Sequence, residues 1–321
     1  MSNNPQERKA HFSEKIKTAS YQSLIAQTIP DEKRRNRFLS SILSAVAVNA
    51  ALKECEPGTI LAAAFLGESL GLSPSPQLGH FYMIPFEDKK ANVTNAVFVL
   101  GYKGYIQMAI RSGAYKNIIV TPIKQGELIG YNRITETVSL KPIENDITWE
   151  ATETIGYYAR IELAGGFVKE MYWSKEKMQI HADRYSKAFS MGPVTARDPR
   201  YNRVSYADYV AGKFPKGTEW LYSSFWYKDF DSMALKTMLR QMISKWGVMS
   251  QDLVDVMERD NAIIAYSGGN FEAEPVDIVL ANGDTAQEQE IADETTEDTQ
   301  ETPQANSNTE PKTIEIDFDD L

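Results

Sequence analysis

The hydrophobic and polar positions change period within one stretch, residues 97–117. Residues 97–100 are β-branched and aromatic, which is typical of a buried strand. Beyond Gly101 the apolar residues recur at helical spacing, and they are Tyr102, Ile106, Ala109 and Ile110. The polar residues at a spacing of four, which share another face of the same helix, are Lys103, Gln107 and Arg111. The pattern predicts a strand followed by an amphipathic helix that Gly113 is placed to end.

The polar face of this helix has two interpretations. Amphipathic helices usually turn such a face to water, and the periodicity alone favours that interpretation. The alternative is that two cations and one amide, aligned on one face, contact an anionic partner.

Runs of strand-like residues predict two β-hairpins. The expected strands are 78–86 and 93–100 in the first hairpin, and 154–163 and 167–173 in the second. Helical patterns are expected at 60–70, 231–246 and 253–265, with the last ending at two consecutive glycines. The domain organisation that follows is a flexible arm over residues 1–29, a core over 30–268 and a disordered acidic tail over 269–321.

The charge of the chain is divided unevenly. The net charge of the 321 residues is −10, but residues 272–321 contain 16 acidic residues and one lysine. The preceding 271 residues therefore carry 28 acidic and 33 basic residues, a balance of +5. An acidic tail on a mildly basic body is a weak indication of nucleic-acid binding.

Sequence features that would place the protein outside the cytoplasm are missing. There is no apolar run of 18 residues, and the first residues contain no apolar signal core. The single cysteine, Cys55, excludes an intramolecular disulfide and fits a reducing compartment. We therefore expect a cytoplasmic protein without a membrane segment.

Cations alternate with aromatic residues over residues 183–228, and Lys187 lies in this region. Cations can hold phosphates while aromatic faces stack on bases, so the alternation suits single-stranded nucleic acid. The alternative is a long tyrosine-rich loop that is partly tucked under the domain.

Motifs for common catalytic chemistry are missing. The sequence contains neither GxxxxGK[ST] nor GxGxxG, so nucleotide hydrolysis is not supported. The three histidines form neither HExxH nor a Cys/His metal set. We predict a binding protein with no catalytic or metal-binding residues, and the alternative is a metal-dependent nuclease that uses scattered carboxylates.

Three stretches resemble the RecT-type phage recombinases. They are GLSPSPQLGHFYMIPF at residues 71–86, LGYKGYIQMAIRSG at 100–113 and KDFDSMALKTMLR at 228–240. The resemblance covers about residues 30–265, and its three motifs occur in one order. It implies an α+β fold in which a small antiparallel β-sheet of two hairpins packs against several helices.

The resemblance also implies a function, which is ATP-independent binding and annealing of single-stranded DNA in phage homologous recombination. Family members form rings or helical filaments, so we expect a homo-oligomer that binds single-stranded DNA and the annealed duplex. The expected partners are an exonuclease and the host single-strand-binding protein, in the cytoplasm of a bacterial host. No cofactor is implied, and Mg²⁺ is expected only as a modulator of DNA binding.

The expected DNA-binding residues follow from the matched motifs. Those carried over are Tyr102, Lys103, Tyr105, Gln107, Arg111, Lys236, Thr237 and Arg240, and the cation-rich region adds Lys187. We expect Lys103, Arg111, Lys236 and Arg240 to line one groove and to neutralise the phosphates of one strand.

Two segments have open roles. Residues 190–224 are longer than the usual family connection, and they could bind DNA, pack on a neighbouring subunit or extend freely. Residues 314–321 resemble the acidic tip of bacterial single-strand-binding proteins. Such a tip could occupy the DNA groove or compete for proteins that dock acidic tips, and the alternative is a solubilising tail.

Overall fold

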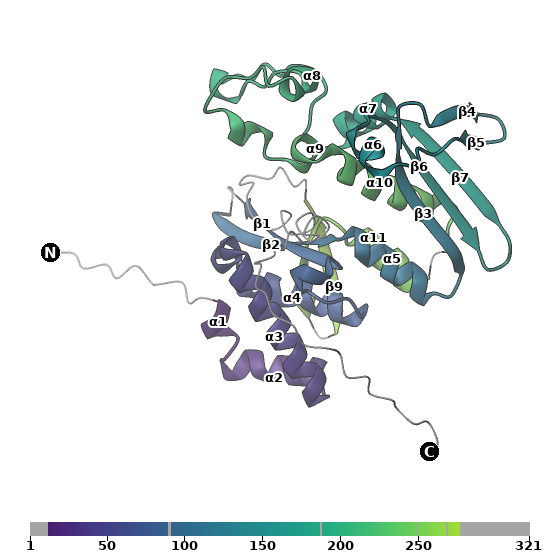
Figure 1. Cartoon of the computed structure of the whole chain (residues 1–321). Helices are drawn as coiled ribbons and strands as arrows, with labels where there is room; N and C mark the ends of the chain where they lie inside the picture. The colour runs from purple at the N-terminus through teal and green to yellow at the C-terminus, as the bar shows by residue number, and fades with distance from the viewer. Residues whose placement is uncertain (1–11, 89–90, 187, 249, 268, 277–321) are drawn as a thin grey trace, which may run out of the picture.

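A computed structural model describes residues 12–88, 91–186, 188–248, 250–267 and 269–276 of the chain (Figure 1). Within these ranges helices combine with antiparallel sheets of four, three and two strands. The α+β fold class expected from the sequence is therefore confirmed. No helix in the described part of the chain is long and apolar enough to cross a membrane.

The four-stranded sheet has the order β1-β2-β8-β9, and all its neighbours are antiparallel. Its strands are β1 (Phe81–Asp88), β2 (Val93–Leu100), β8 (Ala262–Ser267) and β9 (Asn270–Pro275). The β1–β2 hairpin is the one expected from the sequence, and Phe81 pairs with Leu100. Figure 1 shows the N-terminal helices on one side of this sheet, and α4 contacts β1, β2 and β8. The helices of this part are α1 (Phe12–Lys15), α2 (Ala19–Thr28), α3 (Glu32–Val48), α4 (Pro57–Ser69) and α11 (Gln251–Glu258), with 3₁₀ turns at Ala50–Glu54 and Pro76–Leu78.

The three-stranded sheet has the order β3-β6-β7 and contains the second expected hairpin. Its strands are β3 (Tyr115–Lys124), β6 (Thr154–Leu163) and β7 (Val168–Ser174), and a separate hairpin consists of β4 (Leu128–Asn132) and β5 (Thr137–Leu140). The helices α7 and α10 both contact β6. The helices of this part are α6 (Asp146–Ala151), α7 (Lys175–Tyr185), α8 (Tyr206–Val210), α9 (Phe225–Lys228) and α10 (Phe230–Trp246), with 3₁₀ turns at Pro199–Tyr201 and Glu219–Tyr222.

The helix α10 belongs to two hydrophobic clusters. Leu239 and Ile243 are buried in the cluster around α4 and the four-stranded sheet, which we call the first core. Met238 and Met242 are buried in the cluster around the three-stranded sheet, which we call the second core. One helix therefore provides a wall for both cores, and it ends one residue before Gly247.

The helix α5 (Tyr102–Arg111) follows β2 directly, as the sequence predicts. Its amide Tyr105 N–H donates to the carbonyl of Gly101, and Gly113 after its end has φ +67°. This left-handed conformation favours glycine, so the expected glycine stop is present.

The structure corrects the expected flexible arm. Residues 12–28 contain α1 and α2, and their apolar side chains reach the first core. Phe12 and Ile25 are fully buried there, because each occupies one apolar face of a short helix. Only residues 1–11 of that arm lie outside the described part of the chain.

The prediction of a helix over 253–265 was wrong for the residues after 258. The helix α11 ends at Glu258, and Asn261 adopts φ +61°, which a helix does not contain. Ala262 and Ile263 then pair with β2, so partner strands distant in sequence determine the conformation of this segment. The turn of the β8–β9 hairpin includes Gly269, and the ordered structure passes the boundary expected at 268. Residues 277–321 of the expected tail lie outside the described residues.

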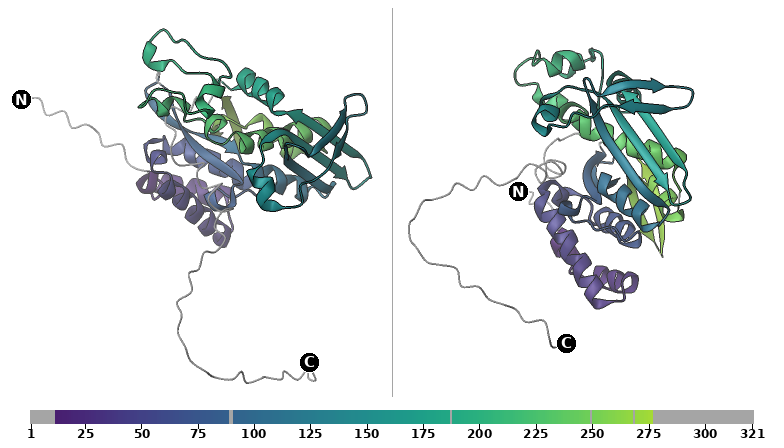
Figure 2. Two further views of the ribbon diagram at one scale, coloured as in Figure 1. Left: turned by 45° about the horizontal axis from the view of Figure 1, so that its top comes forward. Right: turned by 45° about the vertical axis from the view of Figure 1, so that its right-hand side comes forward.

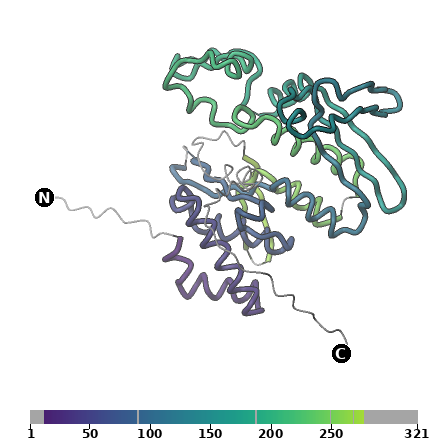
Figure 3. The backbone as a smooth tube through the Cα atoms, viewed as in Figure 1, coloured from purple at the N-terminus to yellow at the C-terminus, as the bar shows by residue number. Residues whose placement is uncertain are grey.

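Residues 188–224 project from the body between α7 and α9, as the views in Figures 2 and 3 agree. Of its aromatic side chains, Phe189, Tyr206 and Tyr222 are buried in the second core together with Trp226 and Tyr227 of α9, and Tyr209 and Phe214 pack against it partly buried. Several of the aromatic residues that alternate with cations in the sequence therefore form part of a hydrophobic core and are not free to stack on bases. Tyr201 and Trp220 are exceptions, because they are exposed and contact each other edge to face at 5.6 Å.

Candidate nucleic-acid interface

The first two motifs pack backbone against backbone. The N–H of Gly101 donates to the carbonyl of His80 at 2.9 Å, at the start of α5. A Cβ atom at Gly101 would lie 2.1 Å from the carbonyl oxygen of Gly79, and one at Gly104 would lie 2.1 Å from that of His80. Glycine is required at both positions because any side chain would collide with fixed backbone. The packing fixes the direction of α5 and hence of its polar face.

The second and third motifs meet at Asp260, a carboxylate with 1% side-chain exposure in the turn before β8. Its Oδ1 accepts the N–H of Leu100 at 2.8 Å. Its Oδ2 accepts the hydroxyl of Tyr105 at 3.1 Å and Nη1 of Arg240 at 3.2 Å. A buried carboxylate is retained only where such partners replace its hydration. Asp260 therefore fixes Arg240 relative to the end of β2 and to α5.

A cavity of ≈ 880 Å³ lies between α7 and α10, and Asp260 and Asn261 contribute to its wall. From α10 it is lined by Lys236, Thr237, Arg240 and Lys245, and from α7 by Lys177, His181 and Arg184. The spacings of four and three place Lys177, His181 and Arg184 on one side of α7, and a spacing of four does the same for Lys236 and Arg240 on α10. The aromatic lining consists of Trp173, Tyr185 and Trp226.

The electrostatics of this cavity are strongly positive. Among the lining residues the five cations Lys177, Arg184, Lys236, Arg240 and Lys245 face one carboxylate, that of Asp260, which leaves a net charge of +4. Asp260 is already bonded to Arg240. No acidic side chain in the described part of the chain lies within ion-pair distance of Lys177, Lys236 or Lys245. We call this feature the cationic cavity.

The titration of two groups reflects this environment. Burial and then the charges of Lys245, Arg184 and Lys177 lower the pKa of His181. Burial and then the charge of Lys245 lower the pKa of Lys177, whose ammonium lies 4.4 Å from the ring centre of Trp173. Each shift has the sign expected where cations are crowded without counter-charges. An anion placed among them would relieve this repulsion.

The cationic cavity unites three of the expected residues. Lys236 and Arg240 line it, and so does Thr237, whose hydroxyl donates to the carbonyl of Met233 within α10 at 2.9 Å. Arg240 keeps 38% side-chain exposure, so it can contact a ligand while bonded to Asp260. Lys187 lies outside the described residues, next to the lining residue Ser186.

The expected residues of α5 lie apart from this cavity. Lys103 is exposed, Gln107 is half-buried, and Tyr102 is partly buried against the first core. Burial and then the charges of Arg111 and Lys103 lower the pKa of His80, so these two cations share the surroundings of that ring. The single groove expected from the sequence is thus divided into a patch on α5 and the cationic cavity, which Tyr105, Asp260 and Arg240 connect internally.

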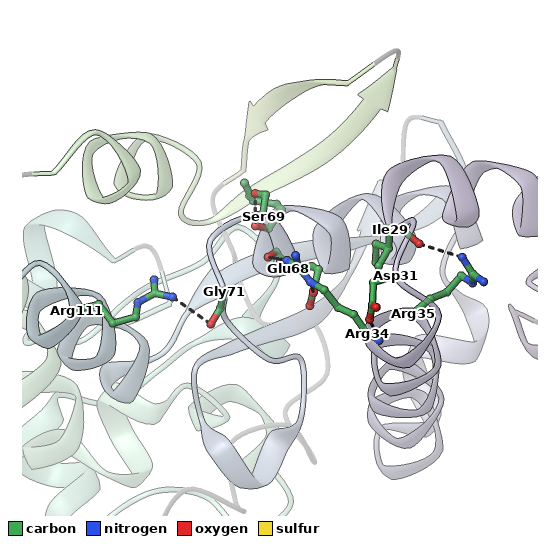
Figure 4. Close-up of polar contacts among 9 residues, drawn as sticks. Ile29, Asp31, Arg34, Arg35, Glu68, Ser69, Gly71 and Arg111 are labelled. Carbon is green, nitrogen blue, oxygen red and sulfur yellow. Dashed lines mark hydrogen bonds and ion pairs between the residues drawn. The ribbon is translucent and has the colours of Figure 1, made fainter.

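Arg111 has a structural contact (Figure 4). It donates to the carbonyl of Gly71 at 3.3 Å and to that of Leu70, which lie just beyond the end of α4. A Cβ atom at Gly71 would lie 2.3 Å from Nη1 of Arg111. The guanidinium thus satisfies carbonyls at a helix C-terminus, where a positive charge is favourable. The basic residue Arg34 nearby is likewise paired with Glu68 (Figure 4).

The structure corrects the prediction for Tyr105. Its side chain has 0% exposure, and its hydroxyl is bonded to Asp260. Burial, followed by the charge of Asp260, raises the pKa of Tyr105 well above its ordinary value. A side chain in this position supports the interface from inside and cannot touch a base or a phosphate.

Sequence reasoning missed half of the cationic cavity. The residues that were not expected there are Trp173, Lys177, His181, Lys245, Asp260 and Asn261, whereas Arg184 and Trp226 belong to the cation-rich and aromatic-rich region 183–228. A signal existed for α7, because Lys177, His181 and Arg184 recur at the helical spacing i, i+4 and i+7 in the sequence. Asp260 carried no local signal, since its partners are distant in the sequence.

In the part of the chain with assigned structure, no three His, Cys, Asp or Glu residues are grouped to hold a metal ion. Burial and then the charges of Glu54 and Glu56 raise the pKa of the Cys55 thiol to about 12. This thiol is therefore protonated at neutral pH and packed in the first core.

Comparison with known proteins supports one relationship. A family model described as the RecT family matches residues 36–278. "Uncharacterized protein YqaK" of Bacillus subtilis (strain 168) is 33% identical over 230 residues, which cover 71% of this chain and 65% of that protein. "Protein RecT" of Escherichia coli (strain K12) is 25% identical over 181 residues, which cover 56% of this chain and 65% of that protein. The matches thus span just under two thirds of each relative.

The family match runs from α3 to just beyond β9, and therefore includes α5, α7, α10 and Asp260. It covers all three motifs together with the cationic cavity that the structure places between them. The chain belongs to the RecT family.

Proposed function

We propose that this protein binds single-stranded DNA in the cationic cavity and anneals complementary strands without ATP. The observation that carries the proposal is the net charge of +4 in a cavity of ≈ 880 Å³ whose lysines have no acidic partner among the described residues. Membership of the RecT family supports the same function.

The mechanism follows from phosphate chemistry. Lys236, Arg240 and Lys245 neutralise the phosphates of one strand and release its counterions, so binding is salt-dependent and independent of sequence. Tyr185, which lines the cavity and is exposed, offers an aromatic surface beside these cations, which suits unpaired bases. A neutralised strand repels its complement less, and base pairing then supplies both the specificity and the free energy of annealing.

The proposal extends to assembly. A single cavity accommodates only a short length of strand, so repeated subunits in a ring or helical filament would extend the binding surface along the DNA. The projecting segment 188–224 exposes Tyr201 and Trp220 and is therefore a candidate for contact between subunits. A partner exonuclease would supply the single strands, and the host single-strand-binding protein would coat them.

The activity is tested with two complementary oligonucleotides, each coated with bacterial single-strand-binding protein, in the absence of ATP. We expect the protein to accelerate duplex formation. An unchanged rate would contradict the proposal. The same labelled strands incubated with Mg²⁺ are expected to keep their length, and their shortening would instead favour a metal-dependent nuclease.

The site is tested with Lys236→Ala and Lys245→Ala. Loss of one phosphate contact should flatten the dependence of log K on log salt by about 0.7 for single-stranded DNA. Lys53→Ala is the matched control, because Lys53 is exposed but does not line the cavity. If log K depends equally on log salt in all three variants and the parent, the cationic cavity does not bind DNA.

A further inference from the structure

The described chain ends beside the cationic cavity. Val276 is the last described residue, and its N–H donates to the carbonyl of Asn261 at 3.0 Å. Asn261 and its neighbour Asp260 both line the cavity. Pro275 pairs with Ala262, which anchors the end of β9 at the same place. The segment that follows, residues 277–321, therefore starts at the wall of the cavity.

The charge of that segment is opposite to that of the cavity. Residues 277–321 contain 14 acidic residues and one lysine, a net charge of −13. The cavity has a net charge of +4, and no acidic side chain in the described part of the chain is within ion-pair distance of Lys177, Lys236 or Lys245. The one lining carboxylate, Asp260, is occupied by Arg240, Tyr105 and the backbone of β2.

Residues 277–321 are long enough to reach across the cationic cavity. An extended chain spans about 3.3 Å per residue, so about ten residues could cross any cavity of this size. A segment tethered at the cavity wall also has a high effective concentration there, of order millimolar for a short flexible link. Even weak individual contacts would then keep the cavity occupied.

We propose that residues 277–321 bind in the cationic cavity of their own chain and compete with DNA for it. This inference rests on the proposed function, because it assigns a regulator to the same site. The acidic side chains of the segment replace the phosphates of the strand, without the bases that would stack on the exposed Tyr185. DNA displaces the segment when it makes more contacts than the segment does, as along several subunits.

The competition has a measurable size. If the segment occupies the cavity in about nine molecules of ten, the apparent affinity for DNA is reduced about tenfold. The effect is electrostatic, so salt should weaken the segment and the DNA together and reduce the difference.

The test uses the full chain in three forms, with binding of a labelled oligothymidylate measured by fluorescence anisotropy. In the first variant the 14 acidic residues of 277–321 are changed to Asn or Gln, as in Asp317→Asn and Glu315→Gln. In the second, a matched control, the order of residues 277–321 is permuted at constant composition. The parent is the third. Length and composition are thus controlled separately from charge.

We expect the neutralised variant to bind DNA about tenfold more tightly than the parent at low salt, and the permuted variant to equal the parent. Equal affinities of the neutralised variant and the parent would overturn the inference while the proposed function stands. A permuted variant that binds as tightly as the neutralised one would also overturn it, because charge would not be the cause. Absence of DNA binding by every form would instead overturn the proposed function.

A second measurement detects the contact directly. Carbodiimide, which joins amines to carboxylates without a spacer, should link Lys236 or Lys245 to the segment, and DNA should suppress these links. Lys53 is the reference amine outside the cavity. Equal linking of Lys53, or links that form only between isotopically distinct chains, would overturn binding within one chain.

Discussion

At the scale of single residues, Asp260 explains why the motif residues do not all line the cationic cavity. This buried carboxylate joins Leu100, Tyr105 and Arg240, which belong to two motifs far apart in the sequence. A motif therefore contains buried residues that position the lining of the cationic cavity as well as residues that line it. Tyr105 belongs to the first kind, whereas Lys236 and Arg240 line the surface.

Tyr105→Phe distinguishes these two roles. The substitution removes one hydrogen bond to Asp260 but keeps the buried ring, so the free energy of unfolding should fall by about 1 kcal/mol. DNA affinity should stay within about twofold of the parent, because the ring is fully buried. Urea unfolding and anisotropy titrations measure the two quantities. A loss of affinity well beyond that, with the fold retained, would return Tyr105 to the DNA-binding surface.

His181 should make the stability of the free protein depend on pH. Its pKa in the folded state lies below the ordinary value of 6.5, because of burial and the neighbouring Lys245, Arg184 and Lys177. Between the two pKa values the unfolded chain binds more protons, so stability is complete above about pH 6.5 and decreases as the pH falls further. The urea concentration at the midpoint of unfolding should therefore decrease as the pH is lowered from about 7.5 to 5.5.

His181→Gln is expected to reduce this fall. It should not abolish it, because the pKa of His80 is lowered as well and acts with the same sign. An identical pH dependence in the variant and the parent would show that His181 does not titrate in the crowded environment described here.

At the scale of elements, close backbone contact decides how α5 is presented. The start of α5 lies on the backbone of Gly79 and His80, and the end of α5 is tied to α4 through Arg111 and Gly71. These contacts hold α5 at both ends, so its exposed residue Lys103 is presented from a rigid support.

Gly104→Ala tests this contact against helix propensity. Alanine favours a helix over glycine by about 1 kcal/mol, but here its Cβ would lie 2.1 Å from the carbonyl oxygen of His80. We expect a net destabilisation of about 2 kcal/mol, as for overpacked sites. Gly165→Ala is the matched control, because nothing lies within 4 Å of the Cβ position in that turn. Equal stabilities of the two variants would show that α5 can move away without cost.

Elements with local signals could be predicted from the sequence, and elements with distant partners could not. Strand-like runs and a glycine turn predict the hairpins β1–β2 and β6–β7. The helical spacing of apolar residues and the position of Gly113 predict α5. The strand β8 was taken for a helix because its pairing with β2 is invisible locally. For the same reason Asp260 was missed, whereas Lys177, His181 and Arg184 of α7 carried a local helical spacing that was not used.

At the scale of the whole molecule, α10 joins the two hydrophobic cores. Leu239 packs in the first core and Met238 in the second, although the two residues are adjacent in sequence. The strand β3 is shared as well, since Tyr115, Ile118 and Val120 pack against both clusters. The two cores should therefore lose their structure together.

Leu239→Ala and Met238→Ala test this coupling. Each truncates a fully buried side chain, so each should lower the free energy of unfolding by about 2–5 kcal/mol. Both variants should shift one common transition, whether it is followed by far-ultraviolet circular dichroism or by tryptophan fluorescence. Two separate transitions, each sensitive to only one variant, would show that the cores unfold independently.

The position of the cationic cavity has a mechanical consequence. Its walls come from α7 and α10 around the second core and from Asp260 and Asn261 in the turn that leads into β8 of the four-stranded sheet. A ligand that contacts both walls links the two parts of the molecule and restrains their motion relative to each other. Binding at this one place should therefore slow amide hydrogen exchange in both sheets at once, including strands that the ligand never touches.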